Sequence, residues 1–158
     1  MGASGRGKTT LLHLLAGLLK PDSGIITGIK KDRRVSVVFQ EDRLLPKFSA
    51  LQNASIVLKT GDTKQKAAAM LQKIGLGDVI HHPIEELSGG MKRRVAIARA
   101  LLYEPDILIM DEPFKGLDTE LKHSVIELVQ SLTADTTLIF ASHDISEAKA
   151  FAAEIIVL

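Results

Sequence analysis

The residues at the start of the chain form a phosphate-binding pattern. Gly2-Ala3-Ser4-Gly5-Arg6-Gly7-Lys8-Thr9 matches G-x-x-x-x-G-K-[ST], in which glycines let successive backbone N–H groups turn toward one anion. Lys8 can reach the outer phosphates of a nucleotide, and the Thr9 hydroxyl can ligate Mg²⁺. An ordinary glycine-rich turn can match the same pattern, so the rest of the chain must decide. A nucleoside triphosphate is the first candidate ligand.

Two carboxylates follow an apolar run in the second half of the chain. Ile107–Met110 is uninterrupted and apolar, as a strand covered on both faces should be, and Asp111 and Glu112 come directly after it. Ligands of parallel α/β sheets bind at the carboxyl ends of the strands. Asp111 can therefore hold Mg²⁺, and Glu112 can act on water. Acidic residues also cap turns before proline, here Pro113, but a phosphate loop in the same chain favours the functional interpretation.

A second anion-binding feature is predicted at the start of a helix. Leu87-Ser88-Gly89-Gly90-Met91 offers a hydroxyl, several N–H groups and the positive end of a helix dipole. So short a string also fits a plain flexible N-cap. The roles of two single residues are undecided in the same way. Gln40 is either a ligand or an ordinary strand-end amide, and His143 is either a catalytic group or a solvated or capping histidine.

The elements that must position these residues alternate as in an α/β protein. A short β-branched run precedes Gln40, and the region from about 44 to 103 has a helical pattern with capping residues at Ser49, Asp62 or Thr63, and Ser88. Helical spacing between two apolar runs predicts a parallel strand–helix–strand crossover. The predicted strands are Val35–Phe39, Ile107–Met110, Thr137–Phe140 and Ile155–Leu158, and the predicted helices are Leu11–Leu19, 49–58, 62–74, 88–102 and 121–132.

Length and composition narrow the possible functions. The chain has 158 residues, which suits one domain, and its net charge of +1 gives no reason to expect nucleic acid or an anionic membrane as the main ligand. It has no cysteine, which excludes disulfides and thiolate metal sites and fits a reducing compartment. Its most apolar stretch, Leu11–Leu19, is too short for a membrane span.

Taken in order, these motifs resemble the ATP-binding cassette family, the nucleotide-hydrolysing subunits of ABC transporters. The resemblance extends from Gly2 to His143 and rests on motifs that are weak singly and specific together. They are the Walker A loop Gly2–Thr9, the Q-loop glutamine Gln40, the signature Leu87–Met91, the Walker B segment Ile107–Glu112, the D-loop Gly116-Leu117-Asp118 and the switch histidine His143.

The resemblance implies an α/β P-loop NTPase fold with a mainly parallel sheet and a helical insertion. The chain would be one partial ATP-binding domain, with a core formed by residues 1–40 and 105–158 and a helical subdomain at about 41–104. The implied cofactors are ATP and Mg²⁺. The residues expected to cradle the phosphates are Gly2, Ser4, Gly5, Gly7, Lys8, Thr9 and Thr10.

The resemblance also assigns roles to the other motif residues. Thr9, Gln40 and Asp111 would surround Mg²⁺ directly or through water. Glu112 would polarise the attacking water, His143 would contact the γ-phosphate, and these two with Gln40 form the expected catalytic set. Ser88, Gly89 and Gly90 would contact ATP held by the opposite subunit of a dimer, with Asp118 at the same interface.

The implied partners are the transmembrane permease subunits of a transporter and a second cassette, identical or paired, that sandwiches ATP; nucleic acid is not expected. The protein would be cytoplasmic and peripheral on the inner face of the cell membrane. The segment Phe39–Pro46 and a signature ending in Met91 look like the importer branch for nitrate, sulfonates or taurine. Lys47, where that branch often has tryptophan, and Gly116, where alanine or a related residue is usual before Leu-Asp, depart from its pattern.

Two alternatives to a transporter ATPase are open. A DNA-repair-type ATPase shares these motifs, but only 46 residues separate Gln40 from Leu87, too few for the long coiled coil that such proteins insert there. The second alternative is a non-catalytic nucleotide-binding fragment. In the family a strand and an adenine-stacking aromatic residue precede the phosphate loop, and the chain resembles a cassette truncated before them. We then expect unpaired backbone and a hydrophobic slot beside a neighbouring strand.

Overall fold

A three-stranded parallel sheet forms the centre of the protein. The structure is a computed structural model that describes residues 6–30 and 32–157. Strands β1 (Val35–Val38), β2 (Ile107–Asp111) and β3 (Thr137–Ala141) pair in the order β1-β2-β3. Val38 lies opposite Met110, which lies opposite Phe140. The strands therefore end level, and the residues that follow them meet at one edge of the sheet.

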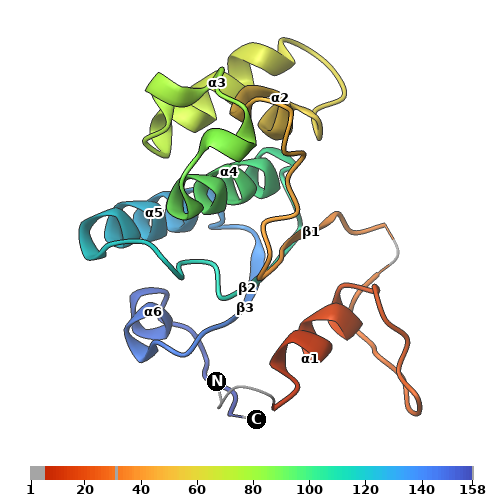
Figure 1. Ribbon diagram of the computed structural model, residues 1–158. Coiled ribbons are helices and arrows are strands. Elements are labelled where there is room, and N and C mark those ends of the chain that lie inside the picture. The colour runs from red at the N-terminus through yellow and green to blue at the C-terminus, as the bar shows by residue number, and fades with distance from the viewer. Residues whose placement is uncertain (1–5, 31, 158) are drawn as a thin grey trace.

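Helical segments connect the strands. Helix α5 (Thr119–Leu132) carries the chain from β2 back to β3, so the predicted parallel crossover is confirmed. Helices α2 (Ala50–Ser55), α3 (Thr63–Lys73) and α4 (Gly89–Leu102), with the short turns η1 (Gly77–Val79) and η2 (Ile84–Glu86), lie between β1 and β2. Figure 1 shows α2 and α3 stacked on the side of α4 that faces away from the sheet. The predicted α/β fold with a helical insertion is present.

Local capping defines the ends of these helices. The Ser49 side chain accepts from the Gln52 N–H, and the Gln52 side chain accepts from the Ser49 N–H, forming a capping box before α2. Asp62 caps α3 by accepting from the Gln65 N–H, and Gly75, at φ +73°, follows its end. The sequence predicted both caps, although α2 ends at Ser55 rather than Leu58.

Side chains alternate between two cores on either face of the sheet. On one face, Leu108 and Met110 pack with α4 and α5, and Val95 and Ile97 of α4 are fully buried. On the other face, Ile107 and Ile109 pack with Leu12 of helix α1 (Lys8–Leu15). Figure 1 shows these two layers, with α4 and α5 on one side of the strands and α1 on the other.

Two predictions about apolar runs were wrong. Helix α1 ends at Leu15, because Gly17 at φ +71° terminates it and the Leu18 N–H turns back to the His13 carbonyl at 2.9 Å. Leu18 and Leu19 are therefore exposed rather than packed. The run beginning at Ile155 is not a strand as far as Val157, and its side chains are exposed. An apolar run becomes a strand only where a neighbouring sheet can bury it. Leu158 lies outside the described residues.

An apolar groove runs beside β3. Within the described part of the chain, the sheet does not continue past β3, and α1, β3 and the segment after α6 (Ile145–Ala150) line a groove of about 620 Å³. Its walls include Leu11, Leu15 and Ile139. The groove is lined mainly by apolar side chains. No helix among the described residues is long and apolar enough to cross a membrane.

Candidate functional site

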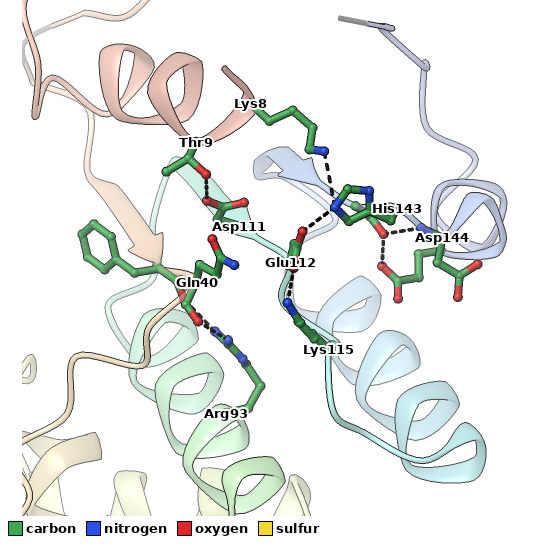
Figure 2. Close-up of polar contacts among 12 residues, drawn as sticks. Lys8, Thr9, Gln40, Arg93, Asp111, Glu112, Lys115, His143 and Asp144 are labelled. Atoms are coloured by element: carbon green, nitrogen blue, oxygen red, sulfur yellow. Dashed lines mark hydrogen bonds and ion pairs between the residues drawn. The ribbon is translucent and has the colours of Figure 1, made fainter. Parts of the chain in front are cut away.

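Polar side chains from α1 and from the ends of all three strands gather at the carboxyl edge of the sheet. Thr9 lies in the first turn of α1, and Gln40, Asp111 and His143 come at or just after the ends of β1, β2 and β3 (Figure 2). Lys8, which lies beside Thr9, and His143 are 135 positions apart in the sequence. The level register of the strands brings them together.

The start of α1 places Lys8 and Thr9 against β2 and the segment after β3. Gly7 has φ +84°, a backbone conformation that favours glycine, and its carbonyl accepts the Leu11 N–H at 2.8 Å in the first turn of the helix. Lys8 is buried, and the Thr9 hydroxyl donates to Asp111 Oδ2 at 2.5 Å. Asp111 itself is only 4% exposed. A hydroxyl and a buried carboxylate thus meet at the helix N-terminus.

Glu112 is held by both its backbone and its carboxylate. Its φ is +46°, and its N–H donates to the Ala141 carbonyl at 2.9 Å. Its Oε1 lies 2.7 Å from His143 Nε2, and its Oε2 accepts from Lys115 Nζ at 3.0 Å. Burial raises the pKa of Glu112, but Lys115 and His143 outweigh it and leave the pKa below its ordinary value. Glu112 is therefore an ionised carboxylate at neutral pH.

The Glu112 backbone is strained for a residue with a side chain. A left-handed conformation in a non-glycine residue costs about 1–3 kcal/mol and persists only where its surroundings fix it. Here the fixing contacts are the bond to Ala141 of β3 and the two partners of the carboxylate. The strain directs the carboxylate toward the segment after β3, where His143 lies.

His143 lies between the Glu112 carboxylate and Lys8. Its Nε2 is 3.4 Å from Lys8 Nζ and 2.7 Å from Glu112 Oε1, and one ring nitrogen can satisfy only one of these partners at a time. The residues around His143 are fixed by their own bonds. Ser142 Oγ donates to Glu147 Oε2 at 2.6 Å and accepts the Asp144 N–H at 2.9 Å. These bonds fix the backbone that carries the half-exposed imidazole.

Gln40 is positioned through its backbone. Its carbonyl and that of Phe39 both accept hydrogen bonds from the guanidinium of Arg93 on α4. Figure 2 shows the Gln40 amide beside Asp111, with Arg93 below it. The predicted residues Lys8, Thr9, Gln40, Asp111, Glu112 and His143 are thus brought to one place. Gly7 adjoins them, and Thr10 is exposed on α1. Gly2, Ser4 and Gly5 lie outside the described residues.

The signature residues and Asp118 are in a different place. Ser88 caps α4 by accepting from the Met91 N–H at 3.3 Å, and Asp118 caps α5 by accepting from the Leu121 N–H at 2.9 Å. The two helix starts adjoin, because a Cβ on Gly90 would lie 3.4 Å from the Gly116 carbonyl oxygen. Ser88, Gly89 and Asp118 are exposed. The bonds of Ser88 and Asp118 lie within the first turns of α4 and α5.

Sequence reasoning missed two residues that contact this cluster. Lys115 lies three positions after Glu112, a spacing that could have suggested the contact. Arg93 belongs to the basic run Lys92-Arg93-Arg94, which gives no hint that its middle member is buried at 6% exposure and reaches back to β1. The contact spans 53 positions of sequence and depends on the packing of α4.

The donor set at the edge of the sheet fits a nucleotide with Mg²⁺. No group of three or more histidine, cysteine or carboxylate side chains among the described residues could hold a metal by itself. Mg²⁺ typically takes one or two carboxylates together with substrate phosphates rather than an all-protein cage. The Thr9 hydroxyl and the buried Asp111 carboxylate, 2.5 Å apart at a helix N-terminus, are oxygen donors of that kind.

Comparison with known proteins identifies the family. Residues 1–115 match the family model described as ABC transporter. The chain belongs to the ABC transporter family. It is 41% identical over 166 residues to the lipoprotein-releasing system ATP-binding protein LolD of Saccharophagus degradans, covering 92% of this chain and 73% of that protein. It is 40% identical over 172 residues to the taurine import ATP-binding protein TauB of Yersinia pestis, covering 100% and 67%.

Solved structures of this family share the fold. The ATP-binding cassette MJ0796, in a dimeric post-hydrolysis state bound to ADP and Pi, superimposes with a TM-score of 0.84 at 29% identity, covering 95% of this chain and 75% of that one. A second dimeric structure of MJ0796, described as a bacterial ABC transporter cassette, gives 0.85 at 30% identity. The P-loop NTPase fold of this ABC chain is thus confirmed, and the chain spans about two thirds to three quarters of the relatives named here.

Proposed function

We propose that this chain binds ATP with Mg²⁺ and hydrolyses it as the nucleotide-binding subunit of an ABC membrane transporter. The observation that carries the proposal is the convergence of Lys8, Thr9, Asp111, Glu112 and His143 at the carboxyl edge of the sheet. Phosphoryl transfer depends mainly on positioning and charge stabilisation. A buried cation, a helix N-terminus, a hydroxyl–carboxylate pair and an ionised base provide both.

Each residue has a distinct role in this proposal. Residues of the phosphate loop, namely Gly2, Ser4, Gly5, Gly7, Lys8, Thr9 and Thr10, bind the phosphates through N–H groups and the Lys8 ammonium. Thr9, Asp111 and Gln40 hold Mg²⁺, which when bound offsets charge on the phosphates and fixes their orientation. Glu112, which its lowered pKa keeps ionised at neutral pH, orients the attacking water and accepts a proton from it.

His143 holds Glu112 in place before the nucleotide binds and contacts the γ-phosphate afterwards. Its Nε2 lies 2.7 Å from Glu112 and 3.4 Å from Lys8. A phosphate that draws Lys8 and His143 toward itself would release the carboxylate to act on water. The structural support behind His143, through Ser142 and Glu147, keeps the imidazole within reach of both partners.

The signature residues act on the nucleotide of a second cassette. Ser88, Gly89 and Asp118 are exposed and stand apart from the cluster around Lys8, which suits groups that complete a partner's site. The MJ0796 structures are dimeric, and one of them holds ADP and Pi. We propose a head-to-tail dimer, of two copies or of paired cassettes, in which the α4 N-terminus with Ser88, Gly89 and Gly90 faces the partner's phosphates.

The setting of the protein is part of the same proposal. Residues 1–40 and 105–158 form the ATP-binding core, and residues 41–104 form the helical subdomain that docks on a transmembrane permease. The protein then lies on the cytoplasmic face of the cell membrane and binds no nucleic acid. For the solute we propose the nitrate, sulfonate or taurine class, supported by the likeness to TauB and by the motif residues Phe39–Pro46. The relative LolD is named for lipoprotein release, so the solute needs its own test.

The proposal is tested by binding and single-turnover hydrolysis of radiolabelled ATP with protein in excess. Wild-type chain should bind ATP and release phosphate only with Mg²⁺. Lys8→Ala should weaken ATP binding by about tenfold or more, because it removes a charge-assisted phosphate contact. Lys20→Ala, at an exposed lysine beyond the end of α1, is the matched control and should bind like wild type. Equal ATP affinity in the wild-type and Lys8→Ala chains would contradict the assignment.

The shared site has a separate test. Chains with Ser88→Arg and chains with Lys8→Ala damage different halves of the composite site, so a mixture should recover part of the wild-type hydrolysis while each alone does not. Heterodimers in the mixture are verified by tagging one of the two chains. Heterodimers that form and show no recovery would refute the shared site, without bearing on ATP binding by a single chain.

A further inference from the structure

The guanidinium of Arg93 donates hydrogen bonds to the backbone just after the end of β1. Arg93 Nη1 donates to the Phe39 carbonyl at 2.6 Å, and Nη2 donates to the Gln40 carbonyl at 2.5 Å. The residue is 6% exposed. The planar fork of an arginine can serve two adjacent carbonyls at once, which a lysine ammonium cannot do with the same geometry. Arg93 therefore fixes the position of the peptide that carries the Gln40 side chain.

A neighbouring carboxylate and a second arginine complete this attachment. Asp42 Oδ1 lies 3.2 Å from Arg93 Nη1, close enough to balance its charge, although it accepts no aligned hydrogen bond from any described residue. Arg99, six residues further along α4, donates to the carbonyls of Asp42 and Arg43. We call Phe39–Arg43 the Q-loop segment. Both arginines hold its backbone to α4.

The other side of the Q-loop segment touches α1. The Phe39 ring meets the ring of His13 edge-on, with 5.8 Å between centroids, and the Arg43 guanidinium lies 3.8 Å above the Phe39 centroid. The segment therefore lies between the helix that follows the phosphate loop and the helix that follows the signature.

We infer that Arg93 is a positioning residue for the nucleotide site, because it fixes the backbone of Gln40 and ties the place of that amide to helix α4. The inference rests on the proposed function for the role of Gln40 beside Asp111. Ser88 precedes Arg93 by five residues, about 7.5 Å along the helix. The same rigid helix thus presents the signature to one nucleotide and holds Gln40 at the other. Arg93 links the two half-sites of a dimer.

Arg94 is a comparison arginine on the same helix. It is 8% exposed, nearly as buried as Arg93, and its Nη1 donates to the carbonyls of Ile74 at 3.0 Å and Gly75 at 2.8 Å, while its Nε donates to the Gly90 carbonyl of its own helix at 3.4 Å. The Ile74 and Gly75 carbonyls follow α3 and lie within the helical layer. Loss of Arg94 should loosen that layer without reaching Gln40. Arg93→Met and Arg94→Met are therefore a matched pair, because the two arginines are similarly buried but bind carbonyls in different parts of the fold.

Hydrogen exchange in the nucleotide-free protein is the first measurement, since it does not depend on ATP hydrolysis. In Arg93→Met, backbone amides of residues 39–45 should exchange about tenfold or more faster than in wild type, the change expected when bonds to a charged donor are lost. In Arg94→Met, the faster exchange should fall on residues 74–77 instead. Arg93→Lys should be intermediate, because its ammonium keeps the charge beside Asp42 but not the fork.

Steady-state hydrolysis with varied Mg²⁺ is the second measurement. Arg93→Met should raise the Mg²⁺ concentration for half-maximal rate and lower kcat by about tenfold, with ATP affinity in the absence of Mg²⁺ unchanged. Arg94→Met should lower thermal stability but leave the Mg²⁺ dependence as in wild type. Equal exchange of residues 39–45 in the two variants, or equal Mg²⁺ dependence, overturns the inference. A wild-type protein without hydrolysis contradicts the proposed function instead, and exchange still decides the role of Arg93.

Discussion

Replacing Glu112 by glutamine should abolish turnover and leave nucleotide binding intact. Glutamine keeps the shape of the side chain and can still accept from His143 through its amide oxygen, so the contact at 2.7 Å survives. It cannot accept a proton from water. Loss of a general base typically costs about 10²–10⁴ in rate, and kcat should fall by that range while ATP affinity stays within about threefold.

Replacement of the neighbouring Lys115 is the reference with which this loss of kcat is compared. Lys115 Nζ lies 3.0 Å from Glu112 Oε2, but the Lys115 side chain is 65% exposed. An ion pair with one exposed partner contributes about 0–1 kcal/mol. Lys115→Met should therefore change kcat by no more than about fivefold, the rate ratio that 1 kcal/mol corresponds to. Glu112→Gln removes this ion pair too, so Lys115→Met isolates its share of the larger effect.

Single-turnover phosphate release, with protein in excess over ATP, measures both variants on the same footing. Size-exclusion chromatography with ATP and Mg²⁺ then asks whether Glu112→Gln accumulates a dimer, as expected if hydrolysis is what separates the subunits. The reasoning would be wrong if Glu112→Gln kept more than about a third of the wild-type rate, or if Lys115→Met lost as much as Glu112→Gln. The second result would mean that charge around Glu112, rather than its basicity, drives the rate.

Three further predictions concern stability and association. Asn53 is fully buried and bonds to the Leu45 N–H and to the carbonyls of Leu45, Phe48 and Ser49, so Asn53→Leu should lower the free energy of unfolding by at least about 2 kcal/mol in urea titrations. Hydrogen bonds from Ser146 and Lys122 lower the pKa of Asp144 to about 2. Since its folded pKa is depressed, its contribution to stability is present above about pH 4 and is lost as the pH falls through about 2. Asp144→Asn should therefore have a lower Tm than wild type at pH 6, and this difference should shrink strongly by pH 2. The groove beside β3 exposes apolar side chains, so the chain should self-associate in sedimentation experiments. Leu11→Lys, at a 38% exposed position on the rim of the groove, should reduce that association without lowering Tm. Unchanged association would show that the groove is not the contact.

The features that the sequence predicted correctly are those that local chemistry decides. The caps at Ser49 and Asp62 need only residues within three positions, and the strands β1 to β3 are short apolar runs with clear ends. From the strand pattern alone, Asp111 was expected at the carboxyl edge of the sheet. The place of Thr9 beside Asp111 spans 102 positions, and it was implied only by the resemblance to the ATP-binding cassette family.

The failures come from tertiary context. The leucine run after Leu15 has helical spacing, but the left-handed Gly17 ends the helix, and Leu18 and Leu19 find no core. Arg93 donates hydrogen bonds to the backbone carbonyls of Phe39 and Gln40. Because every residue has a backbone carbonyl, the residue types in the sequence do not reveal such contacts. Such side chain–backbone contacts depend on how α4 packs across the sheet. They become visible only when the fold is known.

Ser88 and Asp118 have a capping role in the structure, and the proposed function gives them a second role at a partner's nucleotide. Ser88 and Asp118 each cap a helix, and loss of a cap costs about 1 kcal/mol out of about 5–15 kcal/mol for a whole domain. Capping alone therefore cannot make either side chain indispensable, because a chain without one of these caps still folds. Gly89 has open space where a Cβ would lie and an exposed surface, so packing does not require glycine there either. A severe loss of hydrolysis on changing these exposed residues can then only arise from what they contact outside this chain, which is why the α4 N-terminus is the place to look for the partner's nucleotide.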